Sequence, residues 1–103
     1  MPKRYKAVIS PLLAEQLEEL GLVDKAKSAI RDAMSDPERA GKQLTGPLFP
    51  YRRLKISRYR IIYKVDLEAD PVEVHFLYCA IRKQGAKQDV YRQMARAMRR
   101  GEI

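Results

Sequence analysis

Basic side chains follow one face of two predicted strands near the middle of the chain. In residues 53–56, strand alternation puts Arg53 and Lys55 on one side and apolar residues on the other, and in residues 59–65 it puts Arg60 on the cationic side. Across an antiparallel pair these three cations would lie close together, where like charges repel unless an anion lies between them. The pattern predicts a phosphate site on the open face of a small sheet. A solvated outer face with spaced charges is the alternative, because antiparallel sheets commonly carry one.

The chain has the length and composition of one folded domain, which we assign to residues 1–103. Hydrophobic residues make up 46% of it and charged residues 33%, and this composition argues against an intrinsically disordered chain. The formal net charge of +8 predicts an anionic partner, such as nucleic acid or an acidic protein. A basic, solvated surface without a partner is the alternative reading of the charge.

Neither a metal site nor a cofactor is expected. The single Cys79 cannot form an internal disulfide, which suits a reducing cytoplasm, and we expect it to be a small core residue. His75 lies among apolar residues of a predicted strand, so we expect a structural role for it, although histidine is the usual acid-base group near neutral pH. No apolar run is long enough to span a membrane, and no signal peptide follows the basic start. We therefore expect a cytoplasmic protein with no membrane partner.

The first third of the chain predicts a strand and a helical hairpin. Residues 5–10 have the β-branched content of a strand, and Ser10 followed by Pro11 predicts the start of a helix. Gly21 should end that helix, and Asp24 is expected to cap a second one.

The rest of the chain predicts a loop, three strands and a last helix. Turn residues are frequent in 35–50, and strand signals follow at 51–57, 58–66 and 72–81. Apolar residues at helical spacing predict a helix over about 87–100. The expected order β-α-α-β-β-β-α describes an α+β domain with a small, mostly antiparallel sheet, whose helices cover one face and leave the other open.

Two quoted stretches resemble a known family. "GKQLTGPLFPYRRLKISRYRIIYKVD" followed by "VEVHFLYCAIRKQGAKQDVY" is similar to the RelE/ParE superfamily of bacterial toxins, and specifically to its RelE branch. The shared order is a loop ending in Leu-Thr-Gly, a basic strand, the "RYRIIY" strand, a strand that ends in a basic pair, and a tyrosine in "DVY". The resemblance covers nearly the whole chain and implies a RelE-like fold.

The resemblance also implies an activity and partners. Members of the RelE branch are toxins of bacterial toxin-antitoxin systems that cleave mRNA on the ribosome and so inhibit translation. They act without a metal or a small-molecule cofactor, by attack of a ribose 2′-hydroxyl on the adjacent phosphate. This reaction needs a base, cations for the extra charge on phosphorus, and an acid for the leaving oxygen. The implied partners are a cognate antitoxin protein, the ribosome and mRNA.

The resemblance assigns roles to five residues. Lys55 matches the general base, and Arg53 takes the place of a second strand lysine that assists it. Arg60 matches the arginine that stabilises the phosphate, and Arg82 the arginine that protonates or stabilises the leaving group. Tyr91 matches a tyrosine that stacks on or orients a base. The alternative is a surface charge for Arg53 and a core position for Tyr91. Further basic residues expected to contact RNA are Arg52, Arg58, Lys83 and Lys87.

Two departures from the family pattern concern the end of this region. More residues separate Arg82 from Tyr91 than in the family, so Tyr91 is expected on the last helix, and its reach to the site is open. Arg82 also shares its parity with the apolar residues of 72–78, so it must lie beyond the strand end or after a β-bulge if it faces the site.

Two other functions compete with the nuclease. The ParE branch has the same fold but inhibits DNA gyrase without nuclease activity. Likeness in fold alone therefore does not decide between the two functions. A nucleic-acid-binding module without toxicity is the third candidate. The set of basic residues favours the nuclease, because a gyrase inhibitor has no need for cations that converge on the open sheet.

Overall fold

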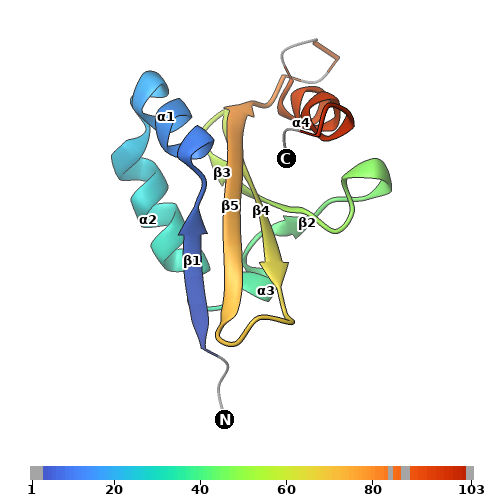
Figure 1. Ribbon diagram of the computed structural model, residues 1–103. Helices are drawn as coiled ribbons and strands as arrows, with labels where there is room; N and C mark the ends of the chain where they lie inside the picture. Colours follow the sequence, from blue (N-terminus) through green and yellow to red (C-terminus); the bar gives the residue numbers. More distant parts are fainter. Residues whose placement is uncertain (1–3, 84, 87–88, 102–103) are drawn as a thin grey trace.

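Five strands form one mixed sheet in the order β1-β5-β4-β3-β2 (Figure 1). A computed structural model describes residues 4–83, 85–86 and 89–101. Within them β1 runs parallel to β5, and the other neighbouring strands are antiparallel. The strands are β1 (Tyr5–Ile9), β2 (Lys42–Gln43), β3 (Arg52–Ile56), β4 (Tyr59–Asp66) and β5 (Val72–Ile81). The helices are α1 (Pro11–Leu20), α2 (Val23–Ala33), α3 (Pro37–Ala40), the 3₁₀ helix η1 (Gly46–Leu48) and α4 (Val90–Arg99).

The expected α+β class is confirmed, but the element order is richer than predicted. The four expected strands and three expected helices all form, with ends that differ by a few residues. The segment 35–50, which we expected to be a loop, contains α3, β2 and η1. These elements have four, two and three residues, too few to show a hydrophobic period. Among the described residues, no helix combines the length and apolar character needed to cross a membrane.

The predicted helix signals hold for α1 and fail for α2. The Ser10 hydroxyl accepts a hydrogen bond from Leu13 N at 3.0 Å, and Gly21 ends α1 in the left-handed conformation, with φ of 67°. Asp24 does not cap α2, because the helix already begins at Val23 after Leu22. Asp24 lies in the first turn instead, where a carboxylate interacts favourably with the helix dipole.

Helices cover both faces of the sheet, which corrects the expectation of one open face. Buried side chains of α1 and α2, among them Leu13 and Ala26, pack on one face against Ile61 and Phe76. On the other face Val90 and Met94 of α4 pack with Leu48 against Ile62, Tyr78 and Ala80. Figure 1 shows α1 and α2 on one side of β5, and α4 beside the end of β5 where the chain leaves it. We call the side of the sheet that carries α4 the α4 face.

A β-bulge in β5 changes which residues face α4. Ile62 pairs with Tyr78 but Tyr63 pairs with Phe76, so Leu77 is an extra residue in β5. Before the bulge, Phe76 packs in the cluster under α1 and α2, whereas after it Tyr78 packs in the cluster under α4. The bulge therefore reverses which side chains of β5 face α4. After it the even-numbered residues do so, and Arg82 belongs to that set.

A buried hydroxyl joins β4 to the segment that leads into β2. Tyr63 is fully buried and donates a hydrogen bond to Pro37 O at 2.8 Å. The same hydroxyl accepts hydrogen bonds from Gly41 N at 3.0 Å and Arg52 Nε at 3.3 Å, and Arg52 Nη2 also donates to Gly41 O. A Cβ at Gly41 would lie 2.2 Å from Arg53 O, so only glycine fits there without a backbone shift. These bonds hold β2 at the edge of β3.

Replacing Tyr63 with Phe should destabilise the protein by about 1–3 kcal/mol. The substitution keeps the ring in the core and leaves the half-buried Gly41 amide and the buried Pro37 carbonyl without their partner. Urea unfolding followed by circular dichroism measures the change. Tyr59→Phe, at a half-buried tyrosine of the same strand, is the matched control and should change the free energy of unfolding by less than about 0.5 kcal/mol. Equal losses in the two variants would contradict the role of the Tyr63 hydroxyl.

Candidate functional site

Three of the predicted cations share the α4 face of the sheet. Lys55 of β3 lies opposite Arg60 of β4, and Arg53 lies opposite Ile62. Arg60 in turn lies opposite Ala80 of β5, and both Ile62 and Ala80 pack under α4. The ladder thus confirms that Arg53, Lys55 and Arg60 lie on one face of an antiparallel pair. We refer to these three residues as the basic row.

Arg82 reaches the same face from just beyond the end of β5. Its amide continues the ladder by donating to Arg58 O at 2.7 Å. Its guanidinium donates to Asp89 Oδ1 at 2.6 Å and lies over the ring of Tyr91, 4.7 Å from the ring centre. An arginine held by a carboxylate on one side and an aromatic face on the other loses little freedom when it binds an anion.

Asp89 organises this region and was not singled out by the sequence analysis. One carboxylate oxygen accepts from Arg82 Nη1 and from Lys83 N, each at 2.6 Å, and the other accepts from Tyr91 N at 3.2 Å. The side chain therefore caps the N-terminus of α4, which begins at Val90, and only 4% of the residue's surface is exposed. Burial raises the pKa of Asp89, but the hydrogen bonds from Arg82, Lys83 and Tyr91 outweigh burial and lower the pKa below its ordinary value. An Asp just before a helical pattern is a known start signal, and it could have been read from the sequence.

A cleft of about 430 Å³ brings three of the predicted site residues together. Arg53, Arg82 and Tyr91 line it, and Lys42 adds a fourth polar group that the sequence analysis missed. Lys42 pairs with Arg53 across β2 and β3. No pattern in the sequence indicates a strand of two residues. The remaining lining residues are Gln43, Leu44, Thr45 and Leu48. We call this space the basic cleft.

Tyr91 lies on α4, as its distance from Arg82 in the sequence predicts, and it also lines the basic cleft. The two alternatives for this residue are therefore compatible. The cleft combines cations with an aromatic ring, and proteins use this combination to hold a phosphate and stack a base of a single-stranded nucleic acid.

Lys55 and Arg60 lie on the same face but do not line the basic cleft. The Lys55 side chain is exposed. Arg60 bends toward the β3–β4 turn, where Nη1 donates to Ser57 O at 3.2 Å and to Tyr59 O at 2.9 Å. Its Nε is buried and has no hydrogen-bond partner among the described residues. Arg60 thus offers a donor that nothing in the described part of the chain satisfies.

The four residues expected to contact RNA do not form one surface. Arg52 projects to the opposite side of β3 and is bound to Tyr63 and Gly41, so it is held inside the fold. Arg58 is exposed in the β3–β4 turn, and Lys83 is exposed next to Arg82. Lys87 lies outside the described residues.

A larger cleft, of about 610 Å³, lies at the edge of β3 against α2 and α3. Four cations line it, Arg39, Lys42, Arg53 and Lys55, but so do the carboxylates of Asp32 and Asp36. Because these carboxylates oppose a phosphate, the smaller basic cleft is the better site for an anion.

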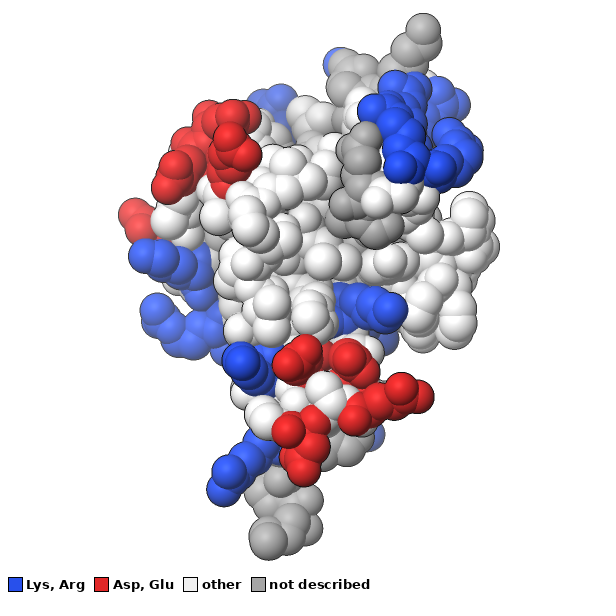
Figure 2. All heavy atoms as spheres, in the orientation of Figure 1, with Lys and Arg blue, Asp and Glu red and all other residues white. Residues whose placement is uncertain are grey.

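Charge is unevenly distributed over the visible surface (Figure 2). Basic side chains gather over α4, which carries Arg92, Arg96 and Arg99, and acidic side chains gather around the β4–β5 turn at the bottom of the view. The arginines of α4 therefore raise the positive potential near the basic cleft, which Tyr91 of the same helix lines.

Cys79 and His75 lie outside the basic cleft. Cys79 is 2% exposed in the core under α1, and burial raises its pKa to about 11, so its thiol stays protonated and inert near neutral pH. His75 belongs to the one group of side chains, among the described residues, whose ligand atoms could hold a metal ion.

The geometry supports anion binding, stacking and the stabilisation of negative charge at the basic cleft. No family model, curated protein or solved structure matches the chain.

Replacing Asp89 with Asn should lower the free energy of unfolding by about 1–2 kcal/mol at pH 7, because the amide caps the helix but lacks the charge that holds Arg82. The pKa of Asp89 is lowered in the folded state, so its contribution is complete above its ordinary pKa of about 3.9 and is lost as the pH falls through the folded-state pKa. The difference in free energy of unfolding between wild type and variant should therefore become smaller as the pH falls from 7 toward 3. Urea unfolding at both pH values measures it.

Asp32→Asn, at an exposed carboxylate of α2, is the control for this comparison. It should stay within about 0.5 kcal/mol of wild type at pH 7. A deficit of Asp89→Asn that persists unchanged at low pH would show that the charge of Asp89 does not stabilise the fold.

Proposed function

We propose that this chain is a RelE-like toxin that cleaves mRNA on the ribosome without a metal. One observation carries the proposal. Arg53 of β3, Arg82 just beyond β5 and Tyr91 of α4 line one cleft, and Lys55 and Arg60 lie on the same face of the sheet beside it. Three of the five residues that the resemblance names therefore meet in one space, and the other two adjoin them. The fold supports the proposal as well, because an antiparallel β3–β4–β5 meander with an N-terminal helical pair is what the resemblance implies.

Arg82 suits the stabilisation of the leaving oxygen, which gains negative charge in the transition state. The bonds to Asp89 and the ring of Tyr91 fix its guanidinium before any substrate arrives. Donors that are already oriented need little reorganisation during the reaction. Such preorganised electrostatic stabilisation is usually the largest single contribution to catalysis. Arg82 still has 27% of its side-chain surface exposed, so its remaining donors are accessible to the RNA.

Lys55 and Arg60 complete the chemistry that we propose. Lys55 takes the proton of the 2′-hydroxyl, which attacks the adjacent phosphate and forms a 2′,3′-cyclic phosphate, and Arg60 across the ladder neutralises the phosphate with its positive charge. Arg82 protonates or stabilises the 5′-oxygen that leaves. Arg53 and Lys42 hold the neighbouring phosphates, and Tyr91 stacks on a base. RNA that follows the basic row would bring a scissile phosphate between Lys55, Arg60 and Arg82.

The partners follow from the same proposal. The toxin acts in the cytoplasm, where ribosomes present mRNA, and an acidic segment of a cognate antitoxin covers the basic surface when the toxin is held inactive. Complementary charge speeds the capture of such a segment and makes its rate fall with added salt.

Replacing Lys55 or Arg60 with Ala should lower the rate of mRNA cleavage by about 100-fold or more, as the loss of one preorganised donor does elsewhere. Arg82→Lys keeps a positive charge but loses the planar fork, so it should also slow cleavage. The measurement is a single-turnover assay on ribosomes programmed with a defined mRNA, alongside ribosome binding for each variant. Lys25→Ala, at an exposed lysine of α2 on the other side of the sheet, is the control and should cut at the wild-type rate.

Three results would reject this assignment. Wild-type cleavage by both Lys55→Ala and Arg60→Ala would show that the site is elsewhere. If these variants bind the ribosome poorly but cut mRNA at the normal rate once the ribosomes are saturated, Lys55 and Arg60 serve only to dock the protein. Inhibition of DNA supercoiling by gyrase, without any cleavage of mRNA by the wild-type protein, would favour the ParE-like alternative.

A further inference from the structure

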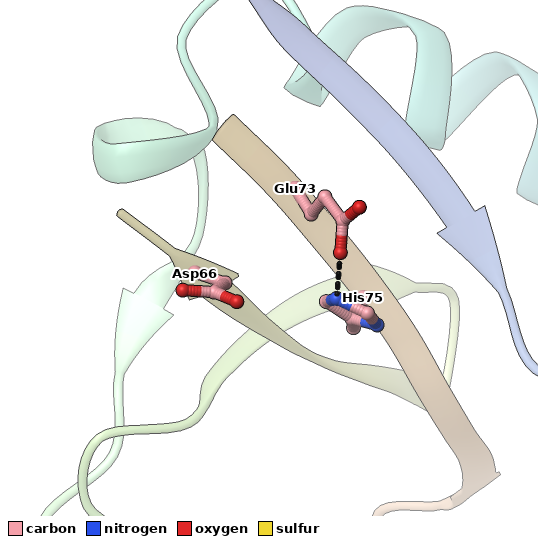
Figure 3. Close-up of side chains that lie close together, drawn as sticks. All are labelled: Asp66, Glu73 and His75. Carbon is pink, nitrogen blue, oxygen red and sulfur yellow. Dashed lines mark hydrogen bonds and ion pairs between the residues drawn. The ribbon is translucent and has the colours of Figure 1, made fainter. Parts of the chain in front are cut away.

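Three side chains at the far end of the β4–β5 hairpin point to a common space (Figure 3). Asp66 comes from β4, and Glu73 and His75 come from β5. Their ligand atoms all lie within 4.8 Å of one another, and His75 Nε2 is 3.0 Å from Glu73 Oε1. The group lies outside the basic cleft, and none of its members has a part in the proposed nuclease chemistry.

The strand register brings the three together. Asp66 pairs directly with Glu73, and His75 follows Glu73 by two residues and so shares its face. Both β5 residues precede the bulge, and Asp66 has the parity of Ile62, so the group lies on the α4 face. The backbone ladder thus fixes the starting points of all three side chains on neighbouring strands.

We propose that Asp66, Glu73 and His75 bind one divalent transition-metal ion of the zinc type. One imidazole nitrogen and two carboxylate oxygens are ligands that such ions accept at about 2.0–2.2 Å. Two ligands of a tetrahedral ion then lie about 3.5 Å apart, so the group needs side-chain adjustments of about 1 Å. The assignment replaces the expectation, made from the sequence, that the chain has no metal site and that His75 is structural.

The surroundings give the ion room for further ligands. A cleft of about 260 Å³ is lined by Asp66 and His75, together with Tyr51, Lys64 and Leu77. Glu73 and His75 each keep 33% of their side-chain surface exposed, so an ion can reach them from solvent. Three protein ligands and an open side describe a site in which water completes the coordination.

The local charge also favours a cation at this end of the molecule. The chain as a whole carries +8, yet the β4–β5 hairpin end is acidic, as Figure 2 shows at the bottom of the view. The carboxylates there are Asp66, Glu68, Asp70 and Glu73. Lys64 lies opposite His75 and is the one cation that lines the adjoining cleft, so it opposes metal binding. Removing the charge of Lys64 should therefore strengthen metal binding, whereas removing a ligand should weaken it.

The test is titration of the tag-free, full-length protein with cobalt(II), followed by its visible spectrum, and with zinc chloride in competition. Wild type should bind one ion per chain. Asp66→Asn, Glu73→Gln and His75→Asn should each weaken binding by about tenfold or more, because each removes a direct ligand. Lys64→Gln should bind as tightly as wild type or up to a few-fold more tightly. Zinc at ten times its dissociation constant should raise the Tm of wild type by roughly 5 °C or more.

Glu68→Gln is the matched control, because it removes an exposed carboxylate of the same hairpin end and keeps the backbone amide that donates to Asp66 Oδ1 at 3.1 Å. It should bind within about twofold of wild type. The proposal is overturned if wild type shows no saturable binding up to about 1 mM metal. It is also overturned if Glu68→Gln weakens binding as much as Glu73→Gln, or if the cobalt spectrum shows a thiolate charge-transfer band, which would move the ion to Cys79. Circular dichroism of each variant shows whether a loss of binding reflects a loss of fold.

Discussion

The extra residue in β5, Leu77, determines what each face of the sheet can do. Before the bulge, Val74 and Phe76 fill the core under α1 and α2, so Glu73 and His75 project to the α4 face. After the bulge the alternation is reversed, so that Arg82 also projects to the α4 face. A regular strand would have sent either Arg82 or the Glu73 and His75 pair to the wrong side. One backbone irregularity therefore places two chemically different groups on the same surface.

The second constraint is the ion pair between Arg82 and Asp89. It ties the end of β5 to the first turn of α4, and it positions the guanidinium over Tyr91. The carboxylate is almost fully buried and accepts hydrogen bonds on both oxygens, so the site is organised before a ligand binds. Fold stability and site geometry thus depend on the same contact, so a substitution at Asp89 should affect both.

Sequence periodicity was sufficient for the regular parts of the fold. Alternation in 51–66 gave β3, β4 and the shared face of Arg53, Lys55 and Arg60, and the Ser10 and Gly21 signals gave α1. It failed where structure depends on contacts between distant segments. Strand β2 exists because Tyr63 and Arg52 hold Gly41 against β3, and no local pattern indicates this. The bulge, the position of α4 over the sheet and the meeting of Asp66 with His75 are likewise set by tertiary packing.

Whether RNA is cut beside the basic cleft by attack of the RNA's own 2′-hydroxyl can be tested directly. A defined mRNA is prepared with a 2′-deoxynucleotide at the position before the cut and is presented to the wild-type protein on ribosomes, beside the all-ribose mRNA. We expect the single missing hydroxyl to abolish cleavage at that bond, while the all-ribose mRNA yields a fragment ending in a 2′,3′-cyclic phosphate. Equal cleavage of the two messages would contradict it, because the nucleophile would then come from elsewhere.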